Sequence, residues 1–306
     1  MLVGAIDCGG TKVLAALVDE KGTVFAPQRA SIPTHDKARY FGGAVSMLRD
    51  ACREQGVAFE TIERVGVSIP GMVDETGLVL GSPSAGWSEF PVKPILRPFL
   101  PDRGIQLFLE NDVNACALAE RRFASGGDDF IWLTVSTGIG GAIVSGGHLL
   151  RGATSCAGEI GHMKVEFDDP APCGCGDCGC LEAHASGTAI GRASVAAGIG
   201  PDALACAKAA QMGDPVAQEI WQRAGGYIGR ALAAAACVVN PRAIYLGGGV
   251  SSSFNLFSQG LKNALFSAVL PQGAEVNIQP TRLGYNASLL GAAALCFRES
   301  GALRAS

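Results

Sequence analysis

Charged side chains are scarce in this chain of 306 residues, at 17% against 48% hydrophobic residues. The Lys and Arg residues are scattered and the formal net charge is −4, so we expect no basic face for nucleic acid. Long apolar runs are missing too: the first is interrupted at Asp7, and the run 231–239 is well short of the about 20 residues that span a bilayer. The composition predicts a globular protein, long enough for two domains, that binds neither nucleic acid nor membrane.

Cysteine is present but not in the pattern of a secreted disulfide framework. The count of 11 is odd, and four of the cysteines are crowded into residues 173–180 while the others are dispersed. Disulfide frameworks belong to oxidising compartments. We therefore expect reduced cysteines and a cytoplasmic location.

A glycine-cornered hairpin is predicted twice. Residues 2–7 and 13–18 read as strands around the Gly9 and Gly10 turn, and residues 130–135 and 142–145 read as strands around a second glycine turn. The repeat suggests two related halves, and the alternation of strands with helical segments elsewhere predicts an α/β protein.

The remaining elements follow from spacing and punctuation. A helix is expected at 40–52, a strand at 65–69 ended by Pro70 and Gly71, and a long helix from Asp214 and Pro215 to about Val239. A strand at 243–246 then enters the run Gly247, Gly248 and Gly249, and helical spacing returns over 254–269.

The first hairpin turn carries groups suited to phosphate chemistry. Asp7, Gly9, Gly10, Thr11 and Lys12 combine an acid, two glycines, a hydroxyl and a cation. Such a turn can present backbone amides to phosphate, while the acid holds Mg²⁺ through water. An ordinary hairpin explains this turn alone about as well.

The second turn, 136–141, contains Thr137 and Gly138 and is similarly ambiguous, as is the approach of Gly248 and Gly249 to a nucleotide. No GxxxxGK(S/T) loop occurs. The residues 174–179 match GxGxxG formally, but they lie between cysteines and follow no clean strand, so we interpret that match as accidental.

The cysteine cluster CGCGDCGCLE is the most specific local signal. Cys173, Cys175, Cys178 and Cys180 are spaced so that several thiolates can surround one tetrahedral ion, and zinc suits such ligands. Disulfides or an iron–sulfur cluster are the alternatives. The cysteines alone favour a four-cysteine site, with His162 left outside it.

Asn111 and Asp112 come at the predicted end of a strand that enters a helix. Either residue could simply cap the helix. Polar residues at the carboxyl end of a strand are also where α/β proteins place ligands. Both readings stay open from these residues alone.

Several motifs in this order resemble the ROK family of bacterial sugar kinases and repressors. They are IDCGGTK at 6–12, ENDVNACALAE at 110–120, STGIGGAIV at 136–144, AGEIGH at 157–162, CGCGDCGCLE at 173–182 and LLGAAAL at 289–295. The resemblance covers nearly the whole chain.

The resemblance implies an actin-like, ribonuclease-H-like pair of α/β domains with a cleft for ATP and sugar. We place the smaller domain at 1–118 together with a C-terminal helix at 289–306, and the larger domain at 119–288. A homodimer is also implied.

The resemblance also implies roles for individual residues. Asp112 is expected to be the general base that takes a proton from the sugar hydroxyl. The expected sugar-binding residues are Asn111, Glu159, His162, Glu182 and Gly71. The residues expected to bind ATP and Mg²⁺ are Asp7, Gly9, Gly10, Thr11, Lys12, Thr137, Gly138, Gly248 and Gly249.

The zinc ligands implied by the resemblance are His162, Cys173, Cys175 and Cys180, a set of three cysteines and one histidine. Cys178 falls where the family pattern has a non-ligand. We expect a structural zinc that fixes one ring nitrogen of His162.

The expected activity is ATP-dependent phosphorylation of glucose at its 6-hydroxyl. Glu159 and the segment around Gly86 and Trp87 are more similar to the glucokinases of the family than to the N-acetylmannosamine kinases. Fructose, mannose, allose, N-acetylglucosamine and N-acetylmannosamine are alternative substrates. A repressor is not expected, because the first motif begins at Ile6 and leaves no room for a preceding DNA-binding domain, but a sugar sensor without catalysis remains an alternative.

Overall fold

The computed structural model describes residues 1–10, 12–74, 76–82, 85–102, 104–270 and 275–297. Thr11, one of the expected nucleotide-binding residues, and the end of the expected C-terminal helix lie outside these residues. The chain forms two compact units. Unit 1 comprises 1–125, 151–156 and 285–306, and unit 2 comprises 126–150 and 157–284.

The boundary expected near residue 118 falls inside a helix, Asp112–Phe123, that belongs to unit 1. A second feature was not anticipated from the sequence. The segment Arg151–Cys156 belongs to unit 1, although the residues on both sides of it belong to unit 2.

Unit 1 is built on a five-stranded sheet in the order β3-β2-β1-β4-β8. Its strands are β1 (Leu2–Cys8), β2 (Val13–Asp19), β3 (Val24–Ala30), β4 (Arg64–Ile69) and β8 (Gln106–Asn111). β1, β2 and β3 pair antiparallel, whereas β1, β4 and β8 pair parallel. A small sheet adds β5 (Met72–Val73), β6 (Leu78–Gly81) and β7 (Phe90–Pro91).

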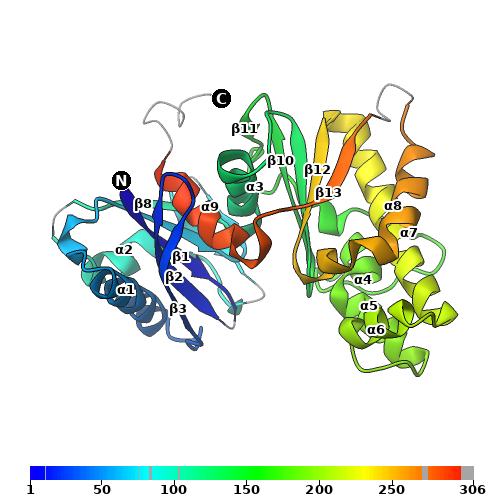
Figure 1. The fold of residues 1–306 in the computed structure, drawn as a ribbon, viewed down its shortest axis with the longest axis horizontal. Helices are drawn as coiled ribbons and strands as arrows, with labels where there is room; N and C mark the ends of the chain where they lie inside the picture. The colour runs from blue at the N-terminus through cyan, green and yellow to red at the C-terminus, as the bar shows by residue number, and fades with distance from the viewer. Residues whose placement is uncertain (11, 75, 83–84, 103, 271–274, 298–306) are drawn as a thin grey trace. The chain divides into compact units, whose positions relative to one another are not determined.

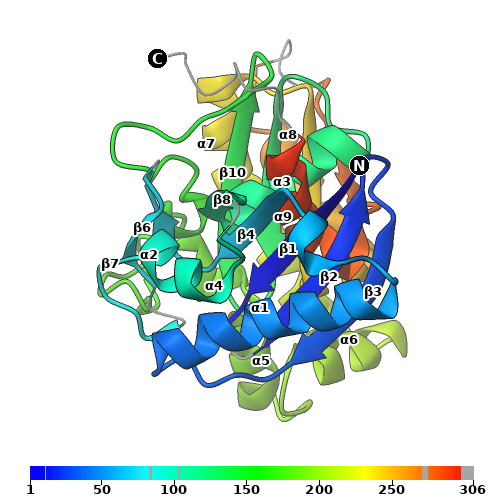
Figure 2. The ribbon, with the colours of Figure 1, turned by 90° about the vertical axis from the view of Figure 1, so that its left-hand side faces the viewer.

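The helices of unit 1 cover both faces of its sheet. They are α1 (Lys37–Glu54), α2 (Val92–Leu96), α3 (Asp112–Phe123) and α9 (Ala287–Cys296). Leu48 of α1 packs on Gly4 of β1, and the backbone of α9 at Ala292 packs on Gly66 of β4. Figure 2 shows α1 lying across the sheet.

Unit 2 repeats the topology of unit 1 with a sheet in the order β11-β10-β9-β12-β13. Its strands are β9 (Phe130–Val135), β10 (Ile139–Ser145), β11 (His148–Leu149), β12 (Ala243–Gly247) and β13 (Asn277–Pro280). An antiparallel hairpin again leads into parallel strands, so the predicted repeat of the glycine-cornered hairpin is confirmed.

The helices of unit 2 lie on the same side of its sheet (Figure 1). They are α4 (Leu181–Ala185), α5 (Gly187–Ala196), α6 (Ala203–Gln211), α7 (Pro215–Val239) and α8 (Phe254–Phe266). The predicted start of α7 is confirmed, since Asp214 accepts a hydrogen bond from the Ala217 amide and Pro215 occupies the first turn. In the described part of the chain, no helix combines the length and apolarity that crossing a membrane requires.

Short 3₁₀ helices complete the described chain. They are η1 (Phe59–Thr61), η3 (Arg97–Phe99), η4 (Ile160–His162), η5 (Gly249–Ser253) and η7 (Gly284–Asn286). Each unit has its own buried hydrophobic core. The core of unit 1 includes Trp87, which packs edge-on against Tyr40 and Phe90 and donates to the Thr34 carbonyl. Trp87 is therefore part of the packing of unit 1.

Candidate functional site

Polar side chains gather at the carboxyl edge of the unit 1 sheet. In the parallel register Asp7 of β1 pairs with Ser68 of β4, and Ser68 pairs with Glu110 of β8. The Asp7 Oδ1 atom accepts hydrogen bonds from the hydroxyls of Ser68 (2.7 Å) and Ser288 (2.6 Å). Burial raises the pKa of Asp7, and these two hydrogen bonds partly oppose the shift.

Asn111 ends β8 and caps α3. Its Oδ1 accepts hydrogen bonds from the amides of Val113 and Asn114, both at 2.9 Å, so the predicted capping is confirmed. Its Nδ2 donates to the Gly71 carbonyl at 2.8 Å and to Asp112 Oδ1 at 3.1 Å. The Asn111 side chain thus links this residue to Gly71, which is also expected to bind sugar. All four of its hydrogen-bonding positions are used in these contacts.

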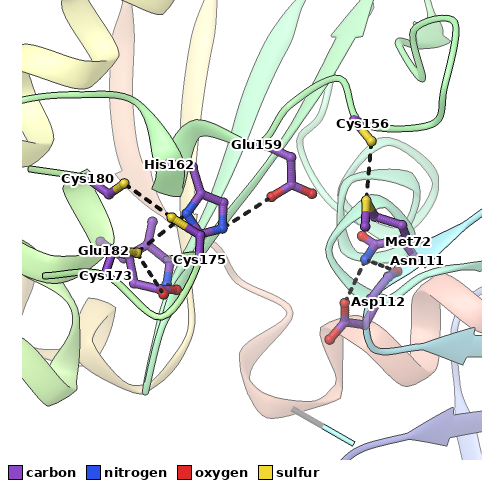
Figure 3. Close-up of polar contacts among 12 residues, drawn as sticks. Met72, Asn111, Asp112, Cys156, Glu159, His162, Cys173, Cys175, Cys180 and Glu182 are labelled. Carbon is purple, nitrogen blue, oxygen red and sulfur yellow. Dashed lines mark hydrogen bonds and ion pairs between the residues drawn. The ribbon is translucent and has the colours of Figure 1, made fainter. Parts of the chain in front are cut away.

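Asp112 is the first residue of α3 and is partly exposed. Its Oδ1 also accepts from the Val113 amide at 3.0 Å. This bond and the one from Asn111 (Figure 3) fix the carboxylate at the helix start. The charge of this carboxylate affects the pKa of the buried Cys116 thiol. Burial raises the pKa of Cys116 well above its ordinary value, and the charges of Asp112 and Asp7 raise it further. Both carboxylates therefore lie near one thiol in unit 1.

Glu110 and Arg151 were not identified from the sequence. Glu110 is only 3% exposed, and its Oε2 accepts from Arg151 Nε at 3.1 Å and from the Arg151 terminal nitrogen. Its Oε1 accepts from the Asn111 amide and from Asn114 Nδ2, each at 3.1 Å. A charged residue at the end of an apolar strand was the signal, because a buried carboxylate requires partners. The partner itself could not be read from the sequence.

The segment Arg151–Cys156 has a second contact in unit 1 at its other end. The Cys156 thiol lies 3.2 Å from the sulfur of Met72, the residue after Gly71 (Figure 3). Arg151 and Cys156 thus attach this segment beside Glu110 and beside the Gly71 turn.

The first glycine turn, 9–12, joins β1 to β2. The Gly9 amide donates to the Lys12 carbonyl at 2.9 Å, and the Tyr40 hydroxyl donates to the Gly9 carbonyl at 2.8 Å. A Cβ on Gly9 would lie 2.6 Å from the Lys12 carbonyl oxygen, so the turn leaves no room for a side chain there.

The second glycine turn, 136–138, joins β9 to β10 in unit 2. The Ser136 amide donates to the Gly138 carbonyl at 2.8 Å. One Glu182 carboxylate oxygen accepts from the Ile139 amide at 2.9 Å, and a Cβ on Gly138 would lie 2.3 Å from the same oxygen. Glu182, expected to read sugar hydroxyls, therefore also holds this turn.

A cavity of about 790 Å³ opens beside the second glycine turn in unit 2. Thr137 and Gly249, both expected to bind the nucleotide, line it, and so do Thr188, Arg192 and Trp221. Gly248 adjoins Gly249 and has φ 84°, and a Cβ there would lie 2.3 Å from the Val135 carbonyl oxygen. Thr137 and Gly249 are thus brought together, although they are 112 positions apart in the sequence.

The four expected zinc ligands lie together in unit 2, and we name this group of side chains the metal cluster. The ligand atoms of His162, Cys173, Cys175 and Cys180 all lie within 4.8 Å of one another. Cys173 Sγ is 3.7 Å from His162 Nδ1, and Cys175 Sγ is 3.7 Å from Cys180 Sγ. Tetrahedral zinc with Zn–S bonds of about 2.3 Å requires ligand separations of about 3.5 to 3.8 Å, so this donor set fits zinc. The geometry favours His162 over Cys178, which the cysteine spacing alone had suggested.

The surroundings of this cluster shift the pKa values of its thiols in opposite directions. Burial raises the pKa of the Cys173 thiol to about 11, so a metal would have to displace its proton. A hydrogen bond from the Asp177 amide is the main cause that lowers the pKa of Cys175. The Lys164 ammonium lies 3.2 Å from Cys180 Sγ and forms an ion pair with Asp177 at 2.7 Å. Lys164 thus places a positive charge beside the sulfur of Cys180.

His162 directs its other nitrogen away from the cysteines. Its Nε2 lies 4.0 Å from the Glu159 carboxylate, which is about half exposed. Figure 3 shows Glu159, His162 and the cysteines on adjoining loops of unit 2. The arrangement brings Glu159 and His162 together as a polar pair beside the metal cluster.

The family model described as the ROK family matches residues 3–299. A glucokinase of Halalkalibacterium halodurans is 31% identical, over 94% of this chain and 92% of the relative. An N-acetylmannosamine kinase of Citrobacter koseri is 33% identical, over 95% of this chain and 97% of the relative. A xylose repressor of Bacillus spizizenii is 26% identical, over 94% of this chain and 74% of the relative.

Solved structures match over similar lengths. A ROK hexokinase from Thermus thermophilus is 35% identical with a TM-score of 0.79, over 96% of this chain and 97% of that one. A ROK glucokinase from Streptomyces griseus, in complex with glucose and AMPPNP, is 31% identical with a TM-score of 0.79, over 97% of this chain and 99% of that one. These matches confirm the α/β class and the actin-like ATPase fold.

Proposed function

Because the chain belongs to the ROK family, we propose that it is a sugar kinase that transfers the γ-phosphoryl group of ATP to the 6-hydroxyl of a hexose, with glucose as the main substrate. The observation that carries the proposal is the carboxylate of Asp112. It is partly exposed at the start of α3, and Asn111 and the Val113 amide hold it in one orientation.

In the proposed reaction Asp112 accepts the proton of the attacking hydroxyl as the new O–P bond forms. The bond between the γ-phosphorus and the β,γ-bridging oxygen breaks, and ADP leaves. A positioned carboxylate supplies on the order of 10² to 10⁴ in rate by such proton transfer. Phosphoryl transfer otherwise depends on placement and on neutralising phosphate charge.

The nucleotide is assigned to the cavity beside the second glycine turn. Its volume and its lining by Thr137 and Gly249 suit an adenine nucleotide. The Streptomyces griseus relative was solved with AMPPNP, which supports nucleotide binding by this chain. Asp7, Gly9, Gly10 and Lys12 are proposed to bind the phosphates and Mg²⁺. Mg²⁺, when bound, neutralises developing phosphate charge.

Zinc is proposed as a structural ion held by His162, Cys173, Cys175 and Cys180. When bound, it would cross-link the loop that carries these residues. A metal held at Nδ1 would leave the proton on Nε2 of His162, the nitrogen that faces Glu159. This pair is proposed to bind sugar hydroxyls together with Glu182.

The choice of glucose rests on the sequence of the Glu159 motif, because the similarities do not separate glucose from N-acetylmannosamine. The glucokinase and N-acetylmannosamine kinase relatives are 31% and 33% identical. Trp87 is buried in the unit 1 core, so it supports this choice only through the pattern of its segment. The homodimer and the cytoplasmic location stay predictions.

The proposal is tested by ADP release with ATP and a panel of glucose, mannose, fructose, allose, N-acetylglucosamine and N-acetylmannosamine. Glucose should give the highest kcat/KM. Asp112→Asn should lower kcat by about 10²-fold or more without changing the fold. Asp36→Asn is the matched control, since Asp36 is also a carboxylate at the start of a helix in unit 1, and it should keep kcat.

Two outcomes would overturn the proposal. Near-normal turnover of Asp112→Asn would make Asp112 only a helix-start residue. A chain that binds glucose but releases no ADP with any sugar of the panel would be a sensor, as the similarity to a repressor allows.

A further inference from the structure

The second glycine turn is held by one short segment, residues 182–188, which we name the clamp segment. Glu182 accepts from the Ile139 amide at 2.9 Å, the Gly187 amide donates to the Ser136 carbonyl at 2.7 Å, and the Thr188 hydroxyl donates to the Thr137 carbonyl at 2.8 Å. Each hydrogen bond reaches a different residue of the turn or its exit. The clamp segment thus defines where the backbone of the turn lies.

The clamp segment starts two residues after the metal-cluster cysteine Cys180. Between them α4 begins, and its Leu181 and Ala185 are fully buried. The Leu181 amide donates to the Met163 carbonyl at 2.9 Å, and the Ala183 amide donates to the Cys180 carbonyl at 3.0 Å. A shift of Cys180 would therefore be transmitted along a buried, hydrogen-bonded helix.

The His162 side of the metal cluster packs against β10, the strand that begins at Ile139. His162 ends η4, and Gly161 lies so close to β10 that a Cβ on it would be 2.0 Å from the Ile139 carbonyl oxygen. The Ile139 amide is the group that Glu182 binds. Ile139 is thus contacted both from the His162 side and from the Cys180 side of the cluster.

Glu182 contacts both the second glycine turn and the metal cluster. Its Oε2 holds the Ile139 amide, and its Oε1 lies 4.0 Å from Cys173 Sγ. Thr137, Gly187 and Thr188 in turn line the cavity assigned to the nucleotide. One continuous set of contacts therefore runs from the metal cluster to the nucleotide cavity within unit 2.

We propose that Glu182 and the clamp segment are positioning elements through which metal occupancy of the His162–Cys180 cluster strengthens nucleotide binding, before any sugar is bound. This inference rests on the proposed function, because it assigns the cavity to ATP. A metal that joins His162 to Cys173, Cys175 and Cys180 fixes both attachments of Ile139 at once. Without the metal the hydrogen bonds of the clamp segment to the turn remain, but the two attachments of Ile139 are no longer joined to each other.

The coupling is reciprocal. If the metal raises the affinity for the nucleotide by some factor, the nucleotide must raise the affinity for the metal by the same factor. Couplings between two sites are typically about 5- to 150-fold. We expect about 10-fold here, since the contacts are short and lie within one unit.

The test measures AMPPNP binding by calorimetry without sugar, on the full chain, together with zinc content by elemental analysis. Removing zinc with a chelator should weaken AMPPNP binding about 10-fold, and adding zinc back should restore it. Glu182→Ala should weaken it by about 5-fold or more while zinc content stays near one per chain. Glu182→Gln, which keeps an acceptor oxygen for the Ile139 amide, should bind nearly as the unchanged protein does.

Matched variants separate the clamp from a general loss of charge in unit 2. Glu219→Ala removes an exposed carboxylate of α7 that belongs to none of these sites, so its AMPPNP affinity should not change. Thr188→Val removes one clamp hydroxyl and should weaken AMPPNP binding about 3- to 10-fold. Thr188→Ser keeps the hydroxyl and should bind normally.

Each outcome of these measurements supports or overturns the inference. If AMPPNP binds the unchanged protein but neither zinc removal nor Glu182→Ala alters its affinity, the coupling is overturned while the proposed function stands. If AMPPNP does not bind the unchanged, zinc-loaded protein at all, the nucleotide assignment fails and the inference fails with it. The inference is supported if AMPPNP binds more weakly after zinc removal and in Glu182→Ala, and if zinc is lost more slowly in the presence of AMPPNP.

Discussion

The two glycine turns look alike in the sequence but are supported differently. In the part of the first turn that the structure describes, which omits Thr11, the support from another element is the Tyr40 hydroxyl on the Gly9 carbonyl. The second turn and its exit share four hydrogen bonds with residues 182–188: one to Glu182, one from Gly187, and two from Thr188 to the Thr137 carbonyl. Its position therefore depends on a segment that comes more than 40 residues later in the chain.

The reason for glycine also differs between the turns. At Gly9 the obstacle to a Cβ is the Lys12 carbonyl, which is backbone of the turn itself. At Gly138 the obstacle is the carboxylate of Glu182, a side chain. Two similar motifs can thus conserve the same shape through different neighbours, and substitutions can tell these neighbours apart.

The largest effect is expected at the base of the second turn. Gly248→Ala places a Cβ 2.3 Å from the Val135 carbonyl oxygen in a conformation, φ 84° and ψ 167°, that is nearly exclusive to glycine. Strain and overpacking together should lower the free energy of unfolding by about 2 to 5 kcal/mol, measured by urea denaturation. Gly249→Ala, with open space around its Cβ, is the control and should change stability by less than about 0.5 kcal/mol. Equal stability of the two variants would contradict the described path of the chain.

The second prediction separates the two turns directly. Gly9→Ala and Gly138→Ala should each weaken AMPPNP binding by about 10-fold, because both displace a turn proposed to bind phosphate. Removing the Glu182 side chain removes the obstacle at Gly138 only. In a Glu182→Ala background Gly138→Ala should therefore cost less than about 3-fold, whereas Gly9→Ala should keep its full cost. If both retain their full cost, Glu182 is not what restricts residue 138.

The smallest effect is expected from Tyr40→Phe. The ring stays packed against Phe41 and Trp87, but the Gly9 carbonyl loses its hydrogen bond. We expect a loss of about 0.5 to 1.5 kcal/mol in the free energy of unfolding, with AMPPNP binding weakened by less than about 3-fold. Tyr285→Phe, on a side chain that is 86% exposed, should have no effect on either measurement. A loss of AMPPNP binding as large as that of Gly9→Ala would show that Tyr40 supports the first turn more strongly than one hydrogen bond can.

Local patterns in the sequence determined much of this protein. The apolar strands of the two hairpins, the two glycine turns and the Asp214–Pro215 helix start were all predictable, because each depends on neighbours within a few residues. The Asn111 cap belongs to the same class. The resemblance of several ordered motifs then identified the family and the fold.

Tertiary structure decided which residues meet. The cysteine spacing alone favoured four cysteines, and only the fold brings His162 to 3.7 Å from Cys173 while Cys178 stays outside the cluster. Likewise Arg151 pairs with Glu110, which is 41 positions away in the sequence. The segment Arg151–Cys156 belongs to unit 1, whereas its sequence neighbours belong to unit 2. Nothing local to Arg151 specifies its partner. Hydrogen bonds and ion pairs act over about 3 to 4 Å in space, so pairs far apart in the chain are set by how strands and helices pack, which a local pattern does not record.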